Sequence, residues 1–151
     1  MPEKETLERA ERDKEEGKSP STQAGEFVRE EMDHIREGKH GARSPQQAIA
    51  IGLSKARRAG VKLPPPKKGR VKESTRQSAE REYRKGQAHN RKKTPKRISR
   101  IREEVLQREP RSSASHQALS KQAKRAAQAR GKASRQAAAR KAVRTRQRKA
   151  A

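Results

Sequence analysis

The sequence predicts a mostly α-helical chain with a small ordered part and a basic, largely disordered C-terminal tail. Leu, Ile, Val and Phe supply only 16 of the 151 residues, well below the roughly 20% under which a highly charged chain is typically disordered. The formal net charge is +24, from 42 Lys and Arg against 18 Asp and Glu. One core cannot span such a chain, because burial of so little apolar surface does not offset the entropy lost on ordering.

The charge is unevenly distributed and divides the chain. Residues 1–37 carry a net charge of −5, residues 38–110 of +16 and residues 111–151 of +13, and Glu109 is the last acidic residue. We expect an acidic, frayed helix first, because Leu7 is its only large apolar residue. The predicted segments are this acidic helix (1–18), a helical hairpin domain (19–63), a Pro-rich basic linker (64–72), a helical basic region (73–110) and a disordered tail rich in Ala, Arg and Lys (111–151).

The large apolar residues concentrate in a predicted two-helix hairpin at about residues 21–63. Ala24, Phe27, Val28, Met32 and Ile35 follow the spacing of one helical face. The opposite side, with Glu30, Glu31 and Asp33, is expected to be solvated. A second helix begins at Ser44 as N-cap with Pro45 in the first turn and ends at Gly60 as a left-handed C-cap. The hairpin would be marginal alone, so a partner or self-association would stabilise it.

The second helix of the hairpin allows two interpretations. Ala48, Gly52 and Leu53 lie at the offsets of the small residue, the turn glycine and the next apolar position of a helix-turn-helix unit. Gln47 and Arg58 would then occupy positions that should be apolar, which counts against that unit. The preferred alternative is one continuous helix through Gly52 that packs closely on its neighbour.

Two further helices are predicted in the central region. A mostly polar helix extends from Glu73 to Gln87, with Tyr83 as its only large apolar contact. A later helix starts after Thr94 and Pro95 and carries a narrow apolar stripe. This stripe needs something to pack against, such as the hairpin or a second copy of the chain, and it consists of Ile98, Ile101, Val105 and Leu106.

Basic residues in the hairpin, the linkers and the tail are the candidate nucleic-acid contacts. Long stretches without acid are costly unless an anionic partner meets them, and phosphate neutralisation releases counterions. In dilute salt we expect the tail to be disordered or transiently helical, with helices forming on either side of Gly131 once phosphates neutralise it. The candidates are Lys55, Arg57, Arg58, Lys67, Lys68, Arg70, Arg91, Lys92, Lys93, Lys121, Lys124, Arg125, Arg130, Arg135, Arg140, Lys141, Arg144, Arg146, Arg148 and Lys149.

Several classes of protein are not expected. The chain has no Cys and only two aromatic residues, so thiol chemistry and base-stacking platforms are disfavoured. No phosphate-binding loop or nucleophile elbow occurs, and we expect no enzyme, no cofactor and no small-molecule substrate. The histidines are scattered in the sequence, so we also expect no metal site. The acidic start and the lack of a long apolar run favour a cytoplasmic, nucleoid location rather than a membrane. The four histidines are His34, His40, His89 and His116.

Residues 19–69 resemble a bacterial family of small basic proteins with a domain of unknown function. The most specific piece is 44–60, with the core Q-A-I-A-I-G-L-S-x-A-R-x-A-G. The resemblance implies a bacterial cytosol and supplies no activity and no catalytic residue. The tail resembles the basic tails of linker-histone-like proteins by composition only.

These features favour a sequence-nonspecific DNA-binding protein of the nucleoid that contacts phosphates. One alternative is a ribosome- or RNA-associated basic protein. Another is a helical interaction module. In it, the acidic N-terminus and the stripe of Ile98, Ile101, Val105 and Leu106 recruit another protein, and the tail only concentrates the chain on nucleic acid.

Overall fold

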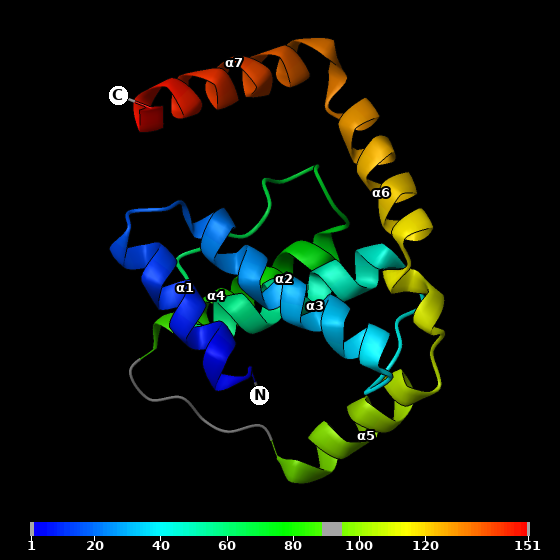
Figure 1. The fold of residues 1–151 in the computed structure, drawn as a ribbon. Helices are drawn as coiled ribbons and strands as arrows, with labels where there is room; N and C mark the ends of the chain where they lie inside the picture. The colour runs from blue at the N-terminus through cyan, green and yellow to red at the C-terminus, as the bar shows by residue number, and fades with distance from the viewer. Residues whose placement is uncertain (1, 89–94, 151) are drawn as a thin grey trace. The chain divides into compact units, whose positions relative to one another are not determined.

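The computed structural model describes residues 2–88 and 95–150, and every regular element in these two ranges is helical. The prediction of a helical fold is therefore confirmed. The chain forms two compact units, residues 1–115 and residues 116–151. Figure 1 shows the order of the helices along the chain.

The predicted hairpin forms the centre of the first unit. Helix α2 (Pro20–Glu37) and helix α3 (Pro45–Ala59) pack against each other and are joined by a short loop. The Ser44 side chain accepts a hydrogen bond from the Gln47 backbone N–H (3.2 Å), and Gly60 ends α3 in the left-handed region at φ 103°. Helix α2 starts earlier than expected, because Ser19 is its N-cap and Pro20 takes the first helical position, where its missing N–H costs nothing.

Two more helices cover the hairpin, so it is not isolated. Helix α1 (Lys4–Glu15) packs on α2, and helix α4 (Glu73–Gln87) packs on α3. The expectation of a frayed N-terminal helix is wrong, because Thr6 and Ala10 are buried and Arg9 Nε lies 2.7 Å from Glu26 Oε2 on α2. Helices α1 and α4 therefore bury hairpin surface that would be exposed if the hairpin stood alone.

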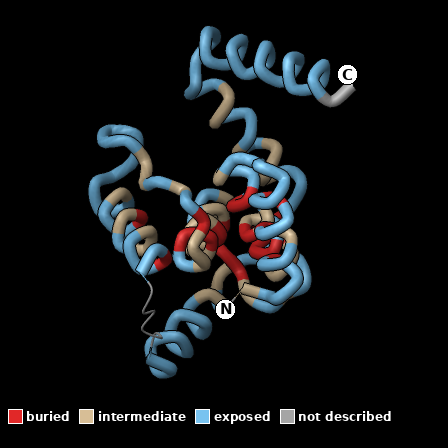
Figure 2. The backbone as a smooth tube through the Cα atoms, turned by 90° about the vertical axis from the view of Figure 1, so that its left-hand side faces the viewer, coloured by how far each residue is buried: buried red, intermediate tan, exposed pale blue. Residues whose placement is uncertain are grey.

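The core of this unit is small and rich in alanine. Ala10, Ala24, Phe27, Ala56 and Val61 form its central cluster, and Figure 2 shows the buried residues concentrated where α1 to α4 meet. Small residues at these positions let the helix backbones approach one another closely. Phe27 is 1% exposed, in agreement with its assignment to the core.

Gly52 lies where α2 and α3 cross at close range. A Cβ atom added to it would lie 2.7 Å from the Val28 Cα and 3.0 Å from the Phe27 carbonyl oxygen. Helix α3 continues through Gly52 without a turn, which confirms the continuous helix and rules out the helix-turn-helix interpretation.

A returning segment closes the other end of the hairpin. The loop between α2 and α3 donates backbone hydrogen bonds from Gly41 to the Leu106 carbonyl (2.9 Å) and from Ala42 to the Pro110 carbonyl (3.0 Å). The short 3₁₀ helix η1 (Arg111–Ala114) then packs on α2, and Arg36 donates to the Ala114 carbonyl. Helix α5 (Lys96–Gln107) has no buried residue.

The second unit consists of α6 (His116–Ala129) and α7 (Gly131–Ala150). The break between them falls at Gly131, which has φ 72°. The tail was expected to be largely disordered, but most of its described residues lie in these two helices. None of the side chains described in these helices is buried. Within the described ranges, no helix of the chain is long and apolar enough to cross a membrane.

Candidate functional site

The basic residues predicted to contact nucleic acid fall into three groups in the structure. The hairpin group, Lys55, Arg57 and Arg58, has internal partners. Arg58 Nε lies 3.2 Å from Glu82 Oε2 on α4, and Lys55 and Arg57 have side chains that are largely buried. The charges of Lys55 and Arg57 are therefore directed into the protein, whereas Arg58 is paired with Glu82 at the surface, where its side chain is 41% exposed.

Arg57 fastens the proline spacer to the end of α3. Its Nε donates to the Leu63 carbonyl (3.2 Å), and its NH2 group lies 3.5 Å from the Pro64 carbonyl. Burial lowers the pKa of the Arg57 guanidinium, because the charged form is less well solvated there. The Arg57 side chain thus has a structural role, whereas the sequence pattern alone predicts it to contact phosphate.

The linker group lies at the surface. Lys67, Lys68 and Arg70 are exposed just after the proline spacer. The other linker candidates, Arg91, Lys92 and Lys93, lie outside the described residues. The exposed linker residues remain available to an anionic ligand.

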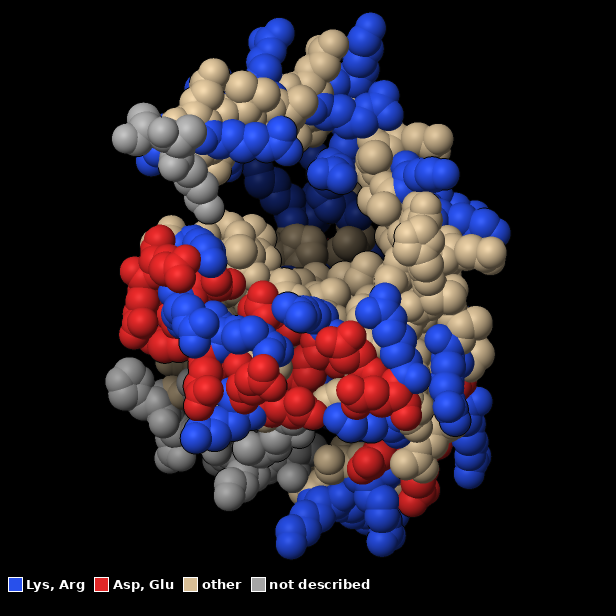
Figure 3. All heavy atoms as spheres, viewed as in Figure 1, with Lys and Arg blue, Asp and Glu red and all other residues tan. Residues whose placement is uncertain are grey.

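The tail group is fully exposed wherever its side chains are described. These residues are Lys121, Lys124, Arg125, Arg130, Lys132, Arg135, Arg140, Lys141, Arg144, Arg146 and Arg148. No carboxylate follows Glu109 in the sequence, so α6 and α7 contain no local counter-charge. Figure 3 shows the contrast, with acidic side chains gathered over α1 and α2 and only basic ones on the C-terminal helices.

A buried charged cluster connects α2 to α3. Glu31 is 0% exposed, and Glu30 is 3% exposed, which corrects the expectation of a solvated face. Lys55 Nζ lies 3.0 Å from Glu30 Oε1 and 2.7 Å from Glu31 Oε2, so it is their shared counterion. The reason is that α2 has helices on two sides, α1 and α3, so that less of its polar side reaches water.

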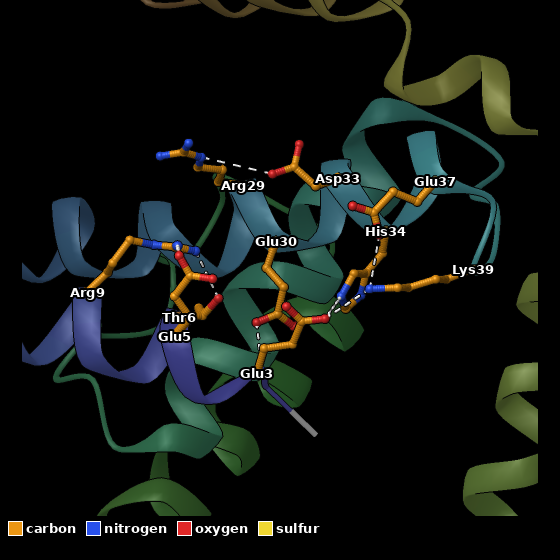
Figure 4. Close-up of a pocket in the computed structure, with 10 residues that line it drawn as sticks. All are labelled: Glu3, Glu5, Thr6, Arg9, Arg29, Glu30, Asp33, His34, Glu37 and Lys39. Atoms are coloured by element: carbon orange, nitrogen blue, oxygen red, sulfur yellow. Dashed lines mark hydrogen bonds and ion pairs between the residues drawn. The ribbon is translucent and has the colours of Figure 1, made fainter.

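The outer edge of this cluster borders a polar pocket of about 250 Å³ between α1 and α2. Figure 4 shows the Glu3 carboxylate directed toward both His34 and Lys39, and its Oε1 lies 2.8 Å from His34 Nε2 and 3.0 Å from Lys39 Nζ. Hydrogen bonds from His34 and Lys39 lower the pKa of Glu3 to about 2. The Glu3 backbone N–H also donates to Glu30 Oε2 (3.1 Å).

For Glu30, burial raises the pKa, but the hydrogen bonds from Lys55 and from the Glu3 backbone outweigh it. The net pKa of Glu30 is lowered, so the carboxylate is held in its charged form.

Two histidines converge on the buried Glu31. One ligand atom each from Glu31, His34 and His40 lies within 4.8 Å of the other two. His40 Nε2 is 2.9 Å from Glu31 Oε1, and the two imidazole rings meet edge to face with centroids 6.0 Å apart. The expectation that all four histidines are scattered is therefore corrected for this pair.

The sequence contains only a weak signal for this convergence. Glu31 and His34 are three residues apart, which places them on one side of a helix. His40 joins them because Gly38 ends α2 in the left-handed region (φ 80°) and reverses the chain. The sequence offers Gly38 as a helix end, but it does not give the direction of the His40 side chain.

The folded core, rather than the tail, resembles known sequences. Residues 13–68 match a family of unknown function (DUF6496). The resemblance found in the sequence to a family with a domain of unknown function is thereby confirmed. The DUF6496 segment contains all of α2 and α3, and with them the cluster of Glu30, Glu31, His34, His40 and Lys55. Helices α4 to α7 lie outside it. No curated protein and no solved structure matches the chain.

Proposed function

We propose that the chain binds double-stranded DNA without sequence specificity, through phosphate contacts made by α6 and α7. The observation that carries this proposal is the set of twelve Lys and Arg between residues 121 and 149 with no acidic residue among them. All of these side chains that are described are exposed. An uncompensated cationic surface of this density favours a polyanion.

The arrangement around α7 supports nonspecific contact. At 100° per residue, the basic residues of α7 are distributed around the whole helix rather than along one face. Free in solution, their mutual repulsion favours a disordered or transiently helical tail. Phosphates remove that repulsion, so helix formation is coupled to binding.

The linker residues Lys67, Lys68 and Arg70 extend the proposed contact surface, as do Arg91, Lys92 and Lys93. Lys55 and Arg57 are left out of it, because Lys55 neutralises two buried carboxylates and Arg57 holds backbone carbonyls. Arg58 is also left out, since it pairs with Glu82.

The described residues offer few groups that could recognise individual DNA bases. Phe27 is buried and Tyr83 is half-buried, so neither offers a free ring on which a base could stack. Because α3 is one continuous helix, the chain also lacks a helix-turn-helix unit at that position. Phosphate contact therefore explains the exposed charge better than base contact, and a protein of this kind would lie with the nucleoid in the cytoplasm.

The test compares the full chain with a variant in which Arg140, Lys141, Arg144 and Arg148 are replaced by Gln. Gln has a helix propensity close to that of Lys and Arg, so the substitutions remove charge with little change in helicity. A matched control exchanges Lys for Arg and Arg for Lys at the same positions. Fluorescence anisotropy on a labelled duplex, at several salt concentrations, gives the affinity and its salt dependence.

Loss of four phosphate contacts should make the negative slope of log K against log salt less steep by up to about 3.6, because each contact contributes about −0.9 to it. The control should keep the slope of the unaltered chain. An unchanged slope in the Gln variant, or an affinity independent of salt, would overturn the proposal. Tighter binding to a structured RNA than to the duplex would instead support the ribosome- or RNA-associated alternative.

We propose self-association through α5 as a second activity, because its apolar stripe is exposed. Ile98, Ile101 and Val105 are 43%, 47% and 52% exposed, whereas Leu106 is half-buried near the hairpin loop. Apolar residues at this spacing on one exposed helix face favour a partner helix.

A further inference from the structure

We propose that Glu31, His34 and His40 form a binding site for a divalent transition metal ion such as Zn²⁺. Two imidazoles and one carboxylate are a common ligand set for this class of ion. The three side chains converge from α2 and from the loop after it, each with a ligand atom within 4.8 Å of the others. Hard cations such as Ca²⁺ and Mg²⁺ prefer oxygen ligands throughout, so they are disfavoured here.

In each histidine, one ring nitrogen lies next to an acceptor of the kind that orients metal-binding histidines. His40 Nδ1 lies 3.0 Å from the Gly41 carbonyl, and His34 Nε2 lies 2.8 Å from Glu3 Oε1. Metal-binding histidines usually donate their second N–H to a carbonyl or a carboxylate, which fixes the ring and its tautomer. These contacts assign Nε2 of His40 and Nδ1 of His34 to the metal.

The contact between His40 and Glu31 offers a place for a cation when Nδ1 is the donor nitrogen of the ring. When His40 donates through Nδ1 to the carbonyl, a neutral ring presents the lone pair of Nε2 to Glu31 Oε1 at 2.9 Å. Two acceptors at that distance repel each other unless a proton or a metal ion lies between them. A divalent metal ion in this position would satisfy both acceptors at once.

Glu31 is a buried carboxylate with capacity for such a ligand. Its side chain is 1% exposed, and although Lys55 Nζ and His40 Nε2 lie close to its two oxygens, neither oxygen accepts a hydrogen bond of good geometry among the described residues. Lys55 occupies the side of Oε2 at 2.7 Å. Oε1 is therefore the oxygen available to bind the metal.

The position of the site in the fold gives the ion a structural consequence. Glu31 and His34 belong to α2, whereas His40 belongs to the loop whose next residues bond to the backbone at Leu106 and Pro110. A metal ion would tie this loop to α2. His34 and His40 have side chains that are 13% and 12% exposed, so the site remains accessible from solvent.

The experiment titrates the full chain with ZnCl₂ by isothermal calorimetry at pH 7.5. We expect one site per chain. His34→Gln and His40→Gln should each lower the affinity by at least about 100-fold, since losing a ligand costs more than losing one of its supporting partners. Glu3→Ala, which removes such a partner, should lower it about 10- to 100-fold. The matched control, His116→Gln on α6, should bind like the unaltered chain.

A second measurement on the unaltered chain does not depend on how well the variants fold. Bound Co²⁺ should show the intense visible absorption of a low-symmetry site with nitrogen ligands, and its affinity should rise from pH 6 to pH 8 as protons compete less. The absence of binding heat, a spectrum of hydrated Co²⁺, or equal affinity in the His34→Gln, His40→Gln and His116→Gln variants would overturn the proposal.

Discussion

Replacing Gly52 with Ala should destabilise the first unit, although Ala is the better helix former. The added Cβ would lie 2.7 Å from the Val28 Cα and 2.9 Å from the Val28 nitrogen. Carbon atoms in favourable contact are about 3.5–4.0 Å apart, so α2 and α3 must separate by about 1 Å. Because the obstructing atoms are backbone, no side-chain rotation relieves the contact.

Overpacking costs about 1–3 kcal/mol, and because the obstructing Val28 atoms belong to the backbone we expect the upper part of that range, about 2–3 kcal/mol. The gain in helix propensity from Gly to Ala is about 1 kcal/mol. The expected net loss in the free energy of unfolding is therefore about 1–2 kcal/mol. Urea denaturation followed by far-ultraviolet circular dichroism measures it as a lower midpoint at constant slope.

Gly25 provides the matched control, because it lies on α2 with nothing within 4 Å of an added Cβ. Gly25→Ala should raise the free energy of unfolding by about 0.5–1 kcal/mol, the propensity gain alone. Gly52→Ala would then lower the free energy of unfolding and Gly25→Ala would raise it, so that the two variants differ by about 2 kcal/mol. A Gly52→Ala chain as stable as the unaltered one would refute the close packing of α2 on α3.

Three further predictions address the buried cluster and the apolar stripe. Lys55→Met should lower the free energy of unfolding by about 3–5 kcal/mol, because it leaves Glu30 and Glu31 buried without their counterion; a urea midpoint within about 1 kcal/mol of the original would contradict this. Stability should fall as the pH decreases from about 4.5 toward 2, because the pKa of Glu3 is 4.5 when unperturbed and about 2 in the fold. The favourable contribution is complete above 4.5 and is lost as Glu3 protonates, so urea midpoints of Glu3→Gln should vary less over this range. Ile101→Glu should abolish self-association in analytical ultracentrifugation while DNA affinity is retained, and unchanged association would exclude the stripe as the interface.

The hairpin could be predicted from the sequence because its signals are local. Ser44, Pro45 and Gly60 mark the ends of α3 by hydrogen-bonding and backbone preferences that act within a few residues. Phe27 and Ile35 mark the buried face of α2 by their spacing. For the same reason Gly52 suggested close packing within a continuous helix, and the structure confirms it.

The packing of α1 could not be predicted in this way. Its buried face consists of Thr6, Ala10 and Asp13, which are small or polar and give no hydrophobic pattern. Without α1 in place, Glu30 and Glu31 were assigned to solvent and Lys55 to phosphate. The charged cluster results from tertiary packing, and charge by itself does not distinguish a residue that faces water from one that neutralises a buried neighbour.

The dimensions of α7 limit how it can affect DNA. Its 20 residues span about 30 Å, a length of duplex that carries roughly 18 phosphates. The helix contributes eight Lys and Arg, fewer than half that number. A duplex lined end to end by a single row of α7 helices would therefore remain an anion, so α7 alone would not compact DNA by neutralising its phosphates.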